Sequence, residues 1–156
     1  MNRKEIALRA VSRFYETPCF PEGAGPDYVN AAAVVASALP AAEVLARLHE
    51  IEADFGRARE TRWGMRTLDI DLIAMGDLVV PDHQTQQAWR DLPMQEQVQA
   101  TPDQLILPHP RLQDRAFVLG PLMDIAPYWK HPLLGKTVAD FHAQLPPEDV
   151  QALKTL

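Results

Sequence analysis

The sequence has 156 residues, of which 47% are hydrophobic, and a formal net charge of -6. This length predicts a single domain over residues 1–156 with a real hydrophobic core, and the acidic balance argues against a non-specific nucleic-acid binder. Cys19 is the single cysteine, which excludes an internal disulfide. No apolar run approaches the ~18 residues of a membrane span, and the first residues do not resemble a signal peptide. We therefore expect a soluble, cytoplasmic protein.

Two segments near the N-terminus predict strands, over residues 6–15 and 28–37. The segment between them, 17–26, contains prolines and glycines that exclude regular structure. Tyr28 and Asn30 share one face at the start of the second strand, where they could stack on and hydrogen-bond a flat polar ring. An ordinary strand edge is the alternative, and these residues alone favour it.

The clearest predicted helix covers residues 41–55. Its apolar side chains recur at helical spacing, and they are Val44, Leu48, Ile51 and Phe55. Pro40 suits the first turn, and Gly56 suits the position just after the last helical residue. His49 and Glu52 lie three apart on this helix, and each on its own is more often a surface residue than a site residue.

Charge is concentrated in residues 57–71. Four arginines stand within ten residues: Arg57, Arg59, Arg62 and Arg66. From Leu68 to near Met75 the alternating pattern predicts a strand whose polar face carries Asp69 and Asp71. Two such carboxylates suit Mg²⁺, and guanidinium groups suit phosphate oxygens. The segment therefore indicates a site for a metal-bound polyphosphate, while a solvated sheet face beside a soluble loop is an equally weighted alternative.

The next segments predict a turn at Gly76 and Asp77, and a short return strand at 78–80. Residues 81–104 contain seven glutamines and are interpreted as a surface insertion with short helical pieces. In residues 105–115, prolines on both sides of His109 hold its backbone extended. A structural loop histidine is the favoured interpretation of His109 from these residues alone.

The last third predicts two helices and a polar tail. The first covers residues 116–125 and is expected to be interrupted near Pro121. The second covers 137–145, with Val138 and Phe141 on its apolar side. The tail is expected to fray.

The motifs of this chain resemble those of the 6-hydroxymethyl-7,8-dihydropterin pyrophosphokinases, enzymes of folate biosynthesis. R-W-G-M-R-T-L-D-I-D at residues 62–71 is close to the family signature, in which proline usually stands at the position of Met65. Further matches follow the family's order: Phe14–Pro18, Pro26–Ala32, Pro108–Leu119 and Asp124–Pro127. Family members open with a strand, a Gly-Ser-Asn or Gly-Ala-Asn turn and a helix. This chain starts almost at the family's second strand, so that first strand and helix are expected to be missing from it.

The resemblance implies an α+β, ferredoxin-like fold and a defined reaction. Pyrophosphate is transferred from ATP to the hydroxymethyl group of the pterin, and AMP is released. The resemblance also implies that Asp69 and Asp71 bind two Mg²⁺ ions, and that the catalytic residues are Asp69, Asp71, Arg57 and Arg66. It assigns ATP contacts to His49, Arg57, Arg59, Trp63, Arg66, Ile106, His109 and Arg115. It assigns the pterin site to Thr17, Pro18, Phe20, Tyr28, Asn30 and Phe117, with Tyr28 and Phe117 sandwiching the ring.

Two other functions stay open. One is a truncated, non-catalytic module that binds nucleotide or pterin, and the other is a small regulatory α+β domain acting through protein contacts. The expected partners are the small-molecule substrates, with neither nucleic acid nor membrane. A monomer is expected, with a dimer as the alternative.

Overall fold

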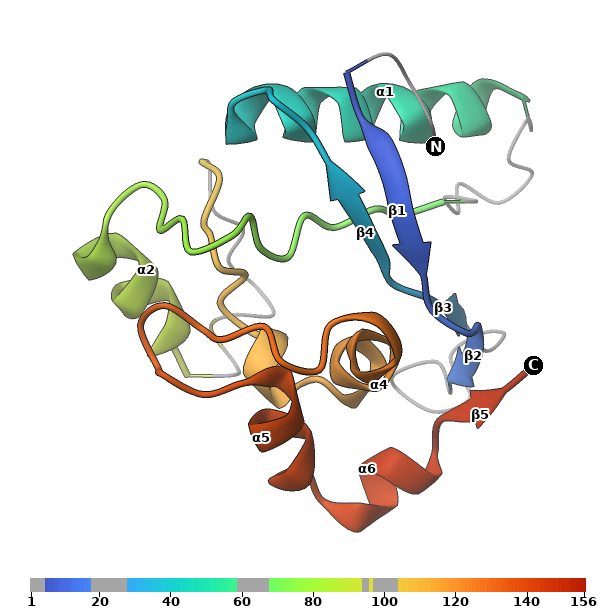
Figure 1. Ribbon diagram of the computed structural model, residues 1–156, viewed down its shortest axis with the longest axis vertical. Coiled ribbons are helices and arrows are strands. Elements are labelled where there is room, and N and C mark those ends of the chain that lie inside the picture. Colours follow the sequence, from blue (N-terminus) through green and yellow to red (C-terminus); the bar gives the residue numbers. More distant parts are fainter. Residues whose placement is uncertain (1–4, 18–27, 59–67, 94–95, 97–103) are drawn as a thin grey trace.

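The computed structural model describes residues 5–17, 28–58, 68–93, 96 and 104–156. Strand β1 (Ala7–Val11) pairs antiparallel with β4 (Ala33–Ala36). Strand β2 (Tyr15–Thr17) pairs antiparallel with β3 (Tyr28–Asn30) on one side and with β5 (Lys154–Thr155) on the other. These antiparallel strands, with helices packed on them, confirm the predicted α+β class (Figure 1).

The two predicted N-terminal strands are both interrupted where Ser12 faces Ala32. The Ser12 N–H donates to the Ala32 carbonyl at 2.9 Å, and the Ser12 hydroxyl accepts from the Ala32 N–H at 2.9 Å. A side-chain oxygen thus takes the place of a ladder carbonyl, which is how serine competes with regular pairing. The chain bends here, so that β1–β4 and β2–β3 form two sheets instead of one long hairpin.

Helix α1 (Ala41–Ala58) packs beside β1 and β4 and forms the first hydrophobic cluster. Its buried side chains are Val44, Leu48 and Ile51, which pack with Ile6. Burying each is worth roughly 1.5–3 kcal/mol. The predicted end at Gly56 is wrong, since the helix continues to Ala58. Gly56 has nothing within 4 Å of where a Cβ would lie, so it continues the exposed face of the helix instead of turning the chain.

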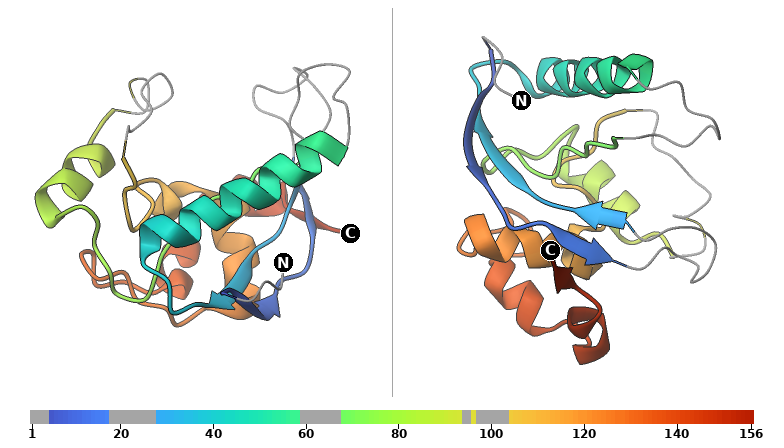
Figure 2. Two further views of the ribbon diagram at one scale, coloured as in Figure 1. Left: turned by 90° about the horizontal axis from the view of Figure 1, so that it is seen from above. Right: turned by 90° about the vertical axis from the view of Figure 1, so that its right-hand side faces the viewer.

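Residues 68–75 run between α1 and α4 as an extended segment (Figures 1 and 2). The predicted strand is wrong, because no strand is assigned to these residues. The predicted alternation holds: Leu68, Ile70 and Leu72 pack on the first cluster, and Asp69 and Asp71 are exposed. The sequence pattern therefore defines the two faces, while a strand also requires a paired neighbour.

The second hydrophobic cluster is built from the C-terminal half. Its elements are η1 (Leu112–Asp114), α4 (Ala116–Ile125) and α5 (Val138–Ala143). Its buried side chains are Leu112, Leu119, Val138 and Phe141. Ile73 of the extended segment packs against this cluster, so the segment connects both cores.

Helix α4 and the C-terminal tail differ from prediction. The helix is not interrupted, although Pro121 is the sixth of its ten residues, because the proline removes one hydrogen bond, the one to the Phe117 carbonyl. The tail does not fray: it forms α6 (Pro147–Gln151) and then β5. Lys154 lies opposite Glu16, an opposite-charge cross-strand pair that favours this edge.

The turn predicted at Gly76 and Asp77 is present, with Gly76 at φ 56. Of the return strand, Val80 forms a single bridge with Leu107. Helix α2 (His83–Arg90) follows and is capped by Asp82, whose carboxylate accepts from the Thr85 N–H at 2.7 Å. None of the helices in the described ranges is long and apolar enough to cross a bilayer.

Candidate active site

The two carboxylates lie on the side of the extended segment that faces away from the first cluster. Hydrogen bonds with two neighbouring elements hold the backbone at Ile70, between the two aspartates, and at Ile73, after the second one. The Ile70 N–H donates to the Glu52 carboxylate of α1 at 2.7 Å, and the Ile73 carbonyl accepts from the His109 N–H at 2.8 Å. Asp69 and Asp71 are therefore presented on a backbone that two neighbouring elements hold.

His109 lies beside this segment, in the Pro-His-Pro stretch. Burial, with the nearby Arg115 and Arg111 guanidinium groups, lowers its pKa from 6.5 to about 4. The side chain is therefore neutral near pH 7. Its Nδ1 accepts from the Arg111 N–H at 3.1 Å, so the proton is on Nε2. A neutral Nε2–H is a hydrogen-bond donor of the kind that a phosphate oxygen accepts.

Arg115 joins the two parts of the predicted site. Burial lowers its pKa, and the attraction of the Asp71 carboxylate opposes that shift. Arginine remains charged despite such shifts. Its guanidinium carbon lies 5.5 Å from the centroid of the Phe117 ring, within cation–π range. Arg115 thus lies near both the carboxylate segment and the aromatic ring that the resemblance assigns to the pterin.

Of the residues predicted to form the pterin site, the four that the structure describes lie on β2, β3 and the first turn of α4. Tyr28 is 50% exposed and Phe117 is 40% exposed, although both are large aromatics. Thr17 is buried, and its hydroxyl accepts from the Asn30 amide at 2.8 Å. Helix α4 contacts both strands. The two half-exposed rings therefore stand on elements in contact, and the polar pair on the same strands is already hydrogen-bonded.

The remaining predicted residues are placed less informatively. His49 is exposed on α1, and the Ile106 side chain is buried in the core. Several predicted site residues lie outside the described residues: Pro18, Phe20, Arg59, Trp63, Arg66 and the side chain of Arg57. These assignments stay predictions from the resemblance.

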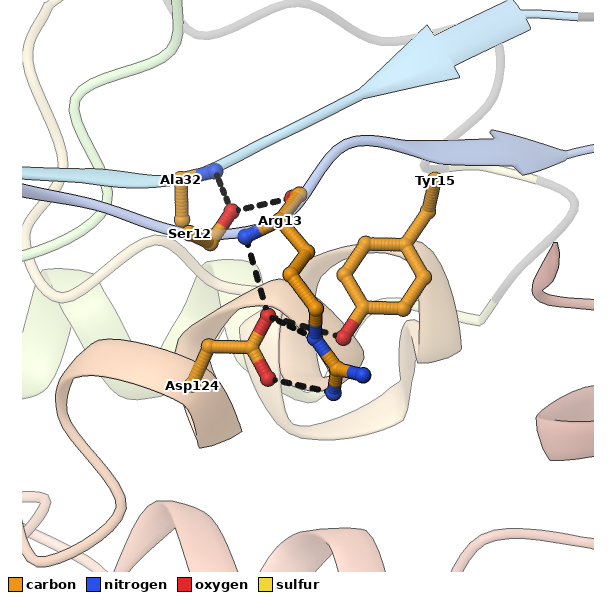
Figure 3. A network of polar contacts seen from close by, with 5 residues as sticks. All are labelled: Ser12, Arg13, Tyr15, Ala32 and Asp124. Atoms are coloured by element: carbon orange, nitrogen blue, oxygen red, sulfur yellow. Dashed lines mark hydrogen bonds and ion pairs between the residues drawn. The ribbon is translucent and has the colours of Figure 1, made fainter. Parts of the chain in front are cut away.

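Four residues that support the site were not assigned a role from sequence. Glu52 is one, because its bond to the Ile70 backbone joins positions 18 apart. The others are Arg13, Tyr15 and Asp124: Arg13 and Tyr15 both donate hydrogen bonds to the Asp124 carboxylate, which lies more than a hundred residues further along the chain (Figure 3). The motifs F-Y-E-T-P and D-I-A-P contain Tyr15 and Asp124 and were the available signal, but sequence spacing does not show that they meet.

Comparison with known proteins decides the family. The model of the 7,8-dihydro-6-hydroxymethylpterin-pyrophosphokinase family matches residues 1–127. The chain belongs to this pyrophosphokinase family. The match contains all the residues assigned to the predicted site, and residues 128–156, with α5, α6 and β5, lie beyond it.

Three relatives of the pyrophosphokinase family, each named 2-amino-4-hydroxy-6-hydroxymethyldihydropteridine pyrophosphokinase, are similar to this chain. The protein from Synechocystis is 40% identical over 90% of the chain, and the protein from Pseudomonas aeruginosa is 34% identical over 96%. The protein from Methylorubrum extorquens is 32% identical over 96%. The matched part spans 61% of the Synechocystis protein, and 79% and 80% of the other two.

The residues at the site fit magnesium by their chemistry. Asp69 and Asp71 offer two exposed carboxylates, and Mg²⁺ usually takes one or two while water and substrate phosphates complete its octahedron. Within the described ranges, no group of three or more His, Cys, Asp or Glu side chains gathers as a ligand set. A metal shared with a polyphosphate suits this pair.

Proposed function

We propose that this chain transfers pyrophosphate from ATP to the hydroxymethyl group of 6-hydroxymethyl-7,8-dihydropterin. The observation that carries the proposal is the position of Arg115. It is attracted by Asp71 and lies over the Phe117 ring. A transfer between a metal-bound polyphosphate and a flat ring requires those two subsites side by side, and membership of the family supports the same reaction.

The proposed reaction is a substitution at the β-phosphorus of ATP. The hydroxymethyl oxygen gives up its proton to solvent and forms a new bond to that phosphorus. The bond between the β-phosphorus and the oxygen that bridges it to the α-phosphate breaks, so that AMP leaves with that oxygen. Little covalent chemistry is asked of the protein in such transfers, where positioning and charge stabilisation dominate. Two Mg²⁺ ions, when bound, would neutralise the charge of the phosphates.

The main predicted site residues then have roles. Asp69 and Asp71 would hold the magnesium ions, with Arg57 and Arg66 acting on the phosphates. Arg115 and the neutral His109 would bind phosphate oxygens by charge-assisted and neutral hydrogen bonds. Tyr28 and Phe117 would stack on the pterin in offset geometry, and Asn30 would hydrogen-bond its polar edge. A cytoplasmic location and a monomeric state remain predictions from the sequence.

The product distinguishes this activity from its alternatives. Incubation with ATP, Mg²⁺ and the reduced pterin should yield AMP, with no AMP when either the pterin or Mg²⁺ is omitted. Formation of ADP would indicate a simple kinase and would contradict the proposal. Tight binding of Mg-ATP without turnover would instead support a non-catalytic nucleotide-binding module, and no binding of either substrate would favour a regulatory domain.

A further inference from the structure

Tyr15 of the F-Y-E-T-P motif and Asp124 of the D-I-A-P motif have no role in the proposed mechanism, and the structure joins them. Asp124, near the end of α4, accepts four hydrogen bonds (Figure 3). Three come from Arg13: its backbone N–H at 3.1 Å, its Nε at 3.2 Å and a terminal nitrogen at 2.8 Å. The fourth comes from the Tyr15 hydroxyl at 2.8 Å. The Asp124 side chain is 15% exposed and the Arg13 side chain is 66% exposed, so the carboxylate is largely covered while the guanidinium lies at the surface.

The cluster lies where the first long strand is interrupted. The backbone N–H of Arg13 donates to Asp124 instead of to a neighbouring strand. Strand β2 therefore begins at Tyr15 with its entry fixed by a side chain of α4. The hydrogen bonds from Arg13 lower the pKa of Asp124 to about 2, so its carboxylate remains a charged acceptor across the working pH range.

The residues on either side of this link belong to the ring site. Tyr15 pairs with Asn30, and Thr17 pairs with Tyr28, in the β2–β3 ladder. On the other side, Phe117 lies in the same helix as Asp124, seven residues earlier, or about 10 Å along the helix axis. Of the four described residues of the ring site, Thr17, Tyr28 and Asn30 lie beside the Arg13 and Tyr15 end of the link. Phe117 lies on the helix that carries Asp124.

We propose that Asp124 is a positioning residue that sets the distance between the β2–β3 ladder and Phe117, and so the affinity for a flat heteroaromatic substrate. It acts through Arg13 and Tyr15 and does not itself touch the ring. The inference rests on the proposed function, because the ring site is assigned through the family. It adds a determinant of pterin affinity that lies outside the stacking residues.

The test compares Asp124→Asn with the matched control Asp140→Asn. Asp140 also accepts a backbone N–H, from Thr137 at 2.9 Å, but it lies on α5 away from β2. We expect Asp124→Asn to raise the KM for the pterin about tenfold, because small misplacements at a binding site are costly. The KM for ATP should stay unchanged. Asp140→Asn should lower the melting temperature without changing either KM.

Two further variants keep the result interpretable. Tyr15→Phe removes only one donor and should raise the pterin KM less than Asp124→Asn does. Asp124→Glu keeps the carboxylate and should recover part of the lost affinity. If Asp124→Asn does not fold, these two variants carry the comparison. Pterin binding is also measured at equilibrium, in the presence of a non-hydrolysable ATP analogue, so that turnover is not required.

The outcomes separate this inference from the proposed function. If the unaltered protein forms no AMP, the proposed function fails, while the equilibrium binding of the pterin still tests Asp124. If the unaltered protein forms AMP and the Asp124 and Tyr15 variants change only the melting temperature, the positioning role is overturned. Equal losses of affinity for ATP and for the pterin would overturn it as well.

Discussion

The two hydrophobic clusters of this protein differ in what they carry. The first packs α1 and Ile6 against one face of the extended segment 68–75, whose other face presents the two exposed aspartates. The second packs η1, α4 and α5 into a core in which Leu112, Leu119 and Val138 are all fully buried. Both cores contact the extended segment, since Ile73 belongs to the second cluster while its neighbour Leu72 belongs to the first.

The second cluster therefore mainly stabilises the fold, whereas the first cluster also positions the residues proposed to carry the reaction. The second cluster is closed by its own helices and by residues beyond the family match, and it provides a base for α4 and Phe117. The first cluster has part of its apolar surface supplied by the segment that carries the carboxylates. Disturbing the first cluster should therefore disturb the chemistry, whereas disturbing the second should mainly cost stability.

The largest effect is expected at the carboxylates themselves. Asp69→Ala or Asp71→Ala should lower AMP formation by at least about 10³-fold, because each would remove charge that stabilises the transition state. The fold should be unaffected, since both side chains are exposed. Asp77→Ala, an exposed carboxylate in the following turn, is the matched control and should keep full activity. Near-normal AMP formation by either site variant at saturating Mg²⁺ would contradict the metal assignment.

The next largest effect compares the two cores directly. Leu48→Ala in the first cluster and Phe141→Ala in the second should each lower the free energy of unfolding by about 2–5 kcal/mol. At a temperature where both variants are folded, we expect only Leu48→Ala to slow AMP formation, because Leu68, Ile70 and Leu72 pack on the cluster it disturbs. The measurements are urea unfolding and AMP release. The comparison breaks down if Phe141→Ala slows the reaction as much as Leu48→Ala does.

Features that depend on local sequence were predicted correctly, whereas features that depend on distant partners were not. The alternation in residues 68–72 predicted which side chains face the first core, because burial depends on local periodicity. It did not predict the absence of strand pairing, because pairing depends on a distant neighbour. The same limit explains the tail, whose pairing with β2 joins residues far apart in sequence. Helix α1 was predicted from its apolar spacing, and only its end was misplaced, at Gly56.

The candidate site could be predicted where the residue types and spacing within a short motif indicate a kind of chemistry. Asp69 and Asp71 were predicted as metal ligands from residue type and spacing, and the structure exposes both of them, while their role stays a prediction. Phe117 was assigned only through the resemblance, since a lone aromatic at a helix start does not indicate a ring site. Asp124 was missed altogether, because its four hydrogen bonds reach residues more than a hundred positions away. Long-range partners of this kind cannot be derived from one sequence.

The pH dependence of stability gives a third, smaller effect. Burial lowers the pKa of His131, beside Phe141 of the second cluster, and of His109, at the site, to about 4. The unfolded chain, with a histidine pKa near 6.5, binds more protons between these values. The stabilising contribution of each neutral histidine is therefore complete above about pH 6.5 and is lost as the pH falls toward 4.

The variant His131→Asn tests how much of the pH-dependent loss of stability comes from the histidine beside the second cluster. The Asn oxygen can replace Nδ1 as acceptor for the Leu133 and Leu134 N–H groups, both at 3.1 Å, but it does not titrate. We expect the loss of stability between pH 7 and about pH 4.5 to shrink by up to roughly 3 kcal/mol. His109→Asn is the corresponding change at the site. Urea unfolding at both pH values is the measurement, and an unaltered pH dependence in His131→Asn would contradict the assignment.

The smallest effect concerns the cap of α5. The Thr137 hydroxyl accepts from the Asp140 N–H at 3.1 Å, and the Asp140 carboxylate accepts from the Thr137 N–H at 2.9 Å, a reciprocal capping box. Thr137→Ala should cost about 1 kcal/mol of unfolding free energy, as N-cap losses typically do. Thr155→Ala, at an exposed position of β5, should change stability by less than about 0.5 kcal/mol.

Because the cap belongs to the second cluster, Thr137→Ala should leave the KM for ATP, the KM for the pterin and the rate of AMP formation unchanged. This makes it the most sensitive probe of the proposed division, since it alters the second core without creating a cavity. A raised pterin KM in Thr137→Ala would mean that small shifts of α5 reach Phe117 through α4, which packs against it. The second cluster would then be part of the binding machinery, and the separation of support from chemistry would not hold.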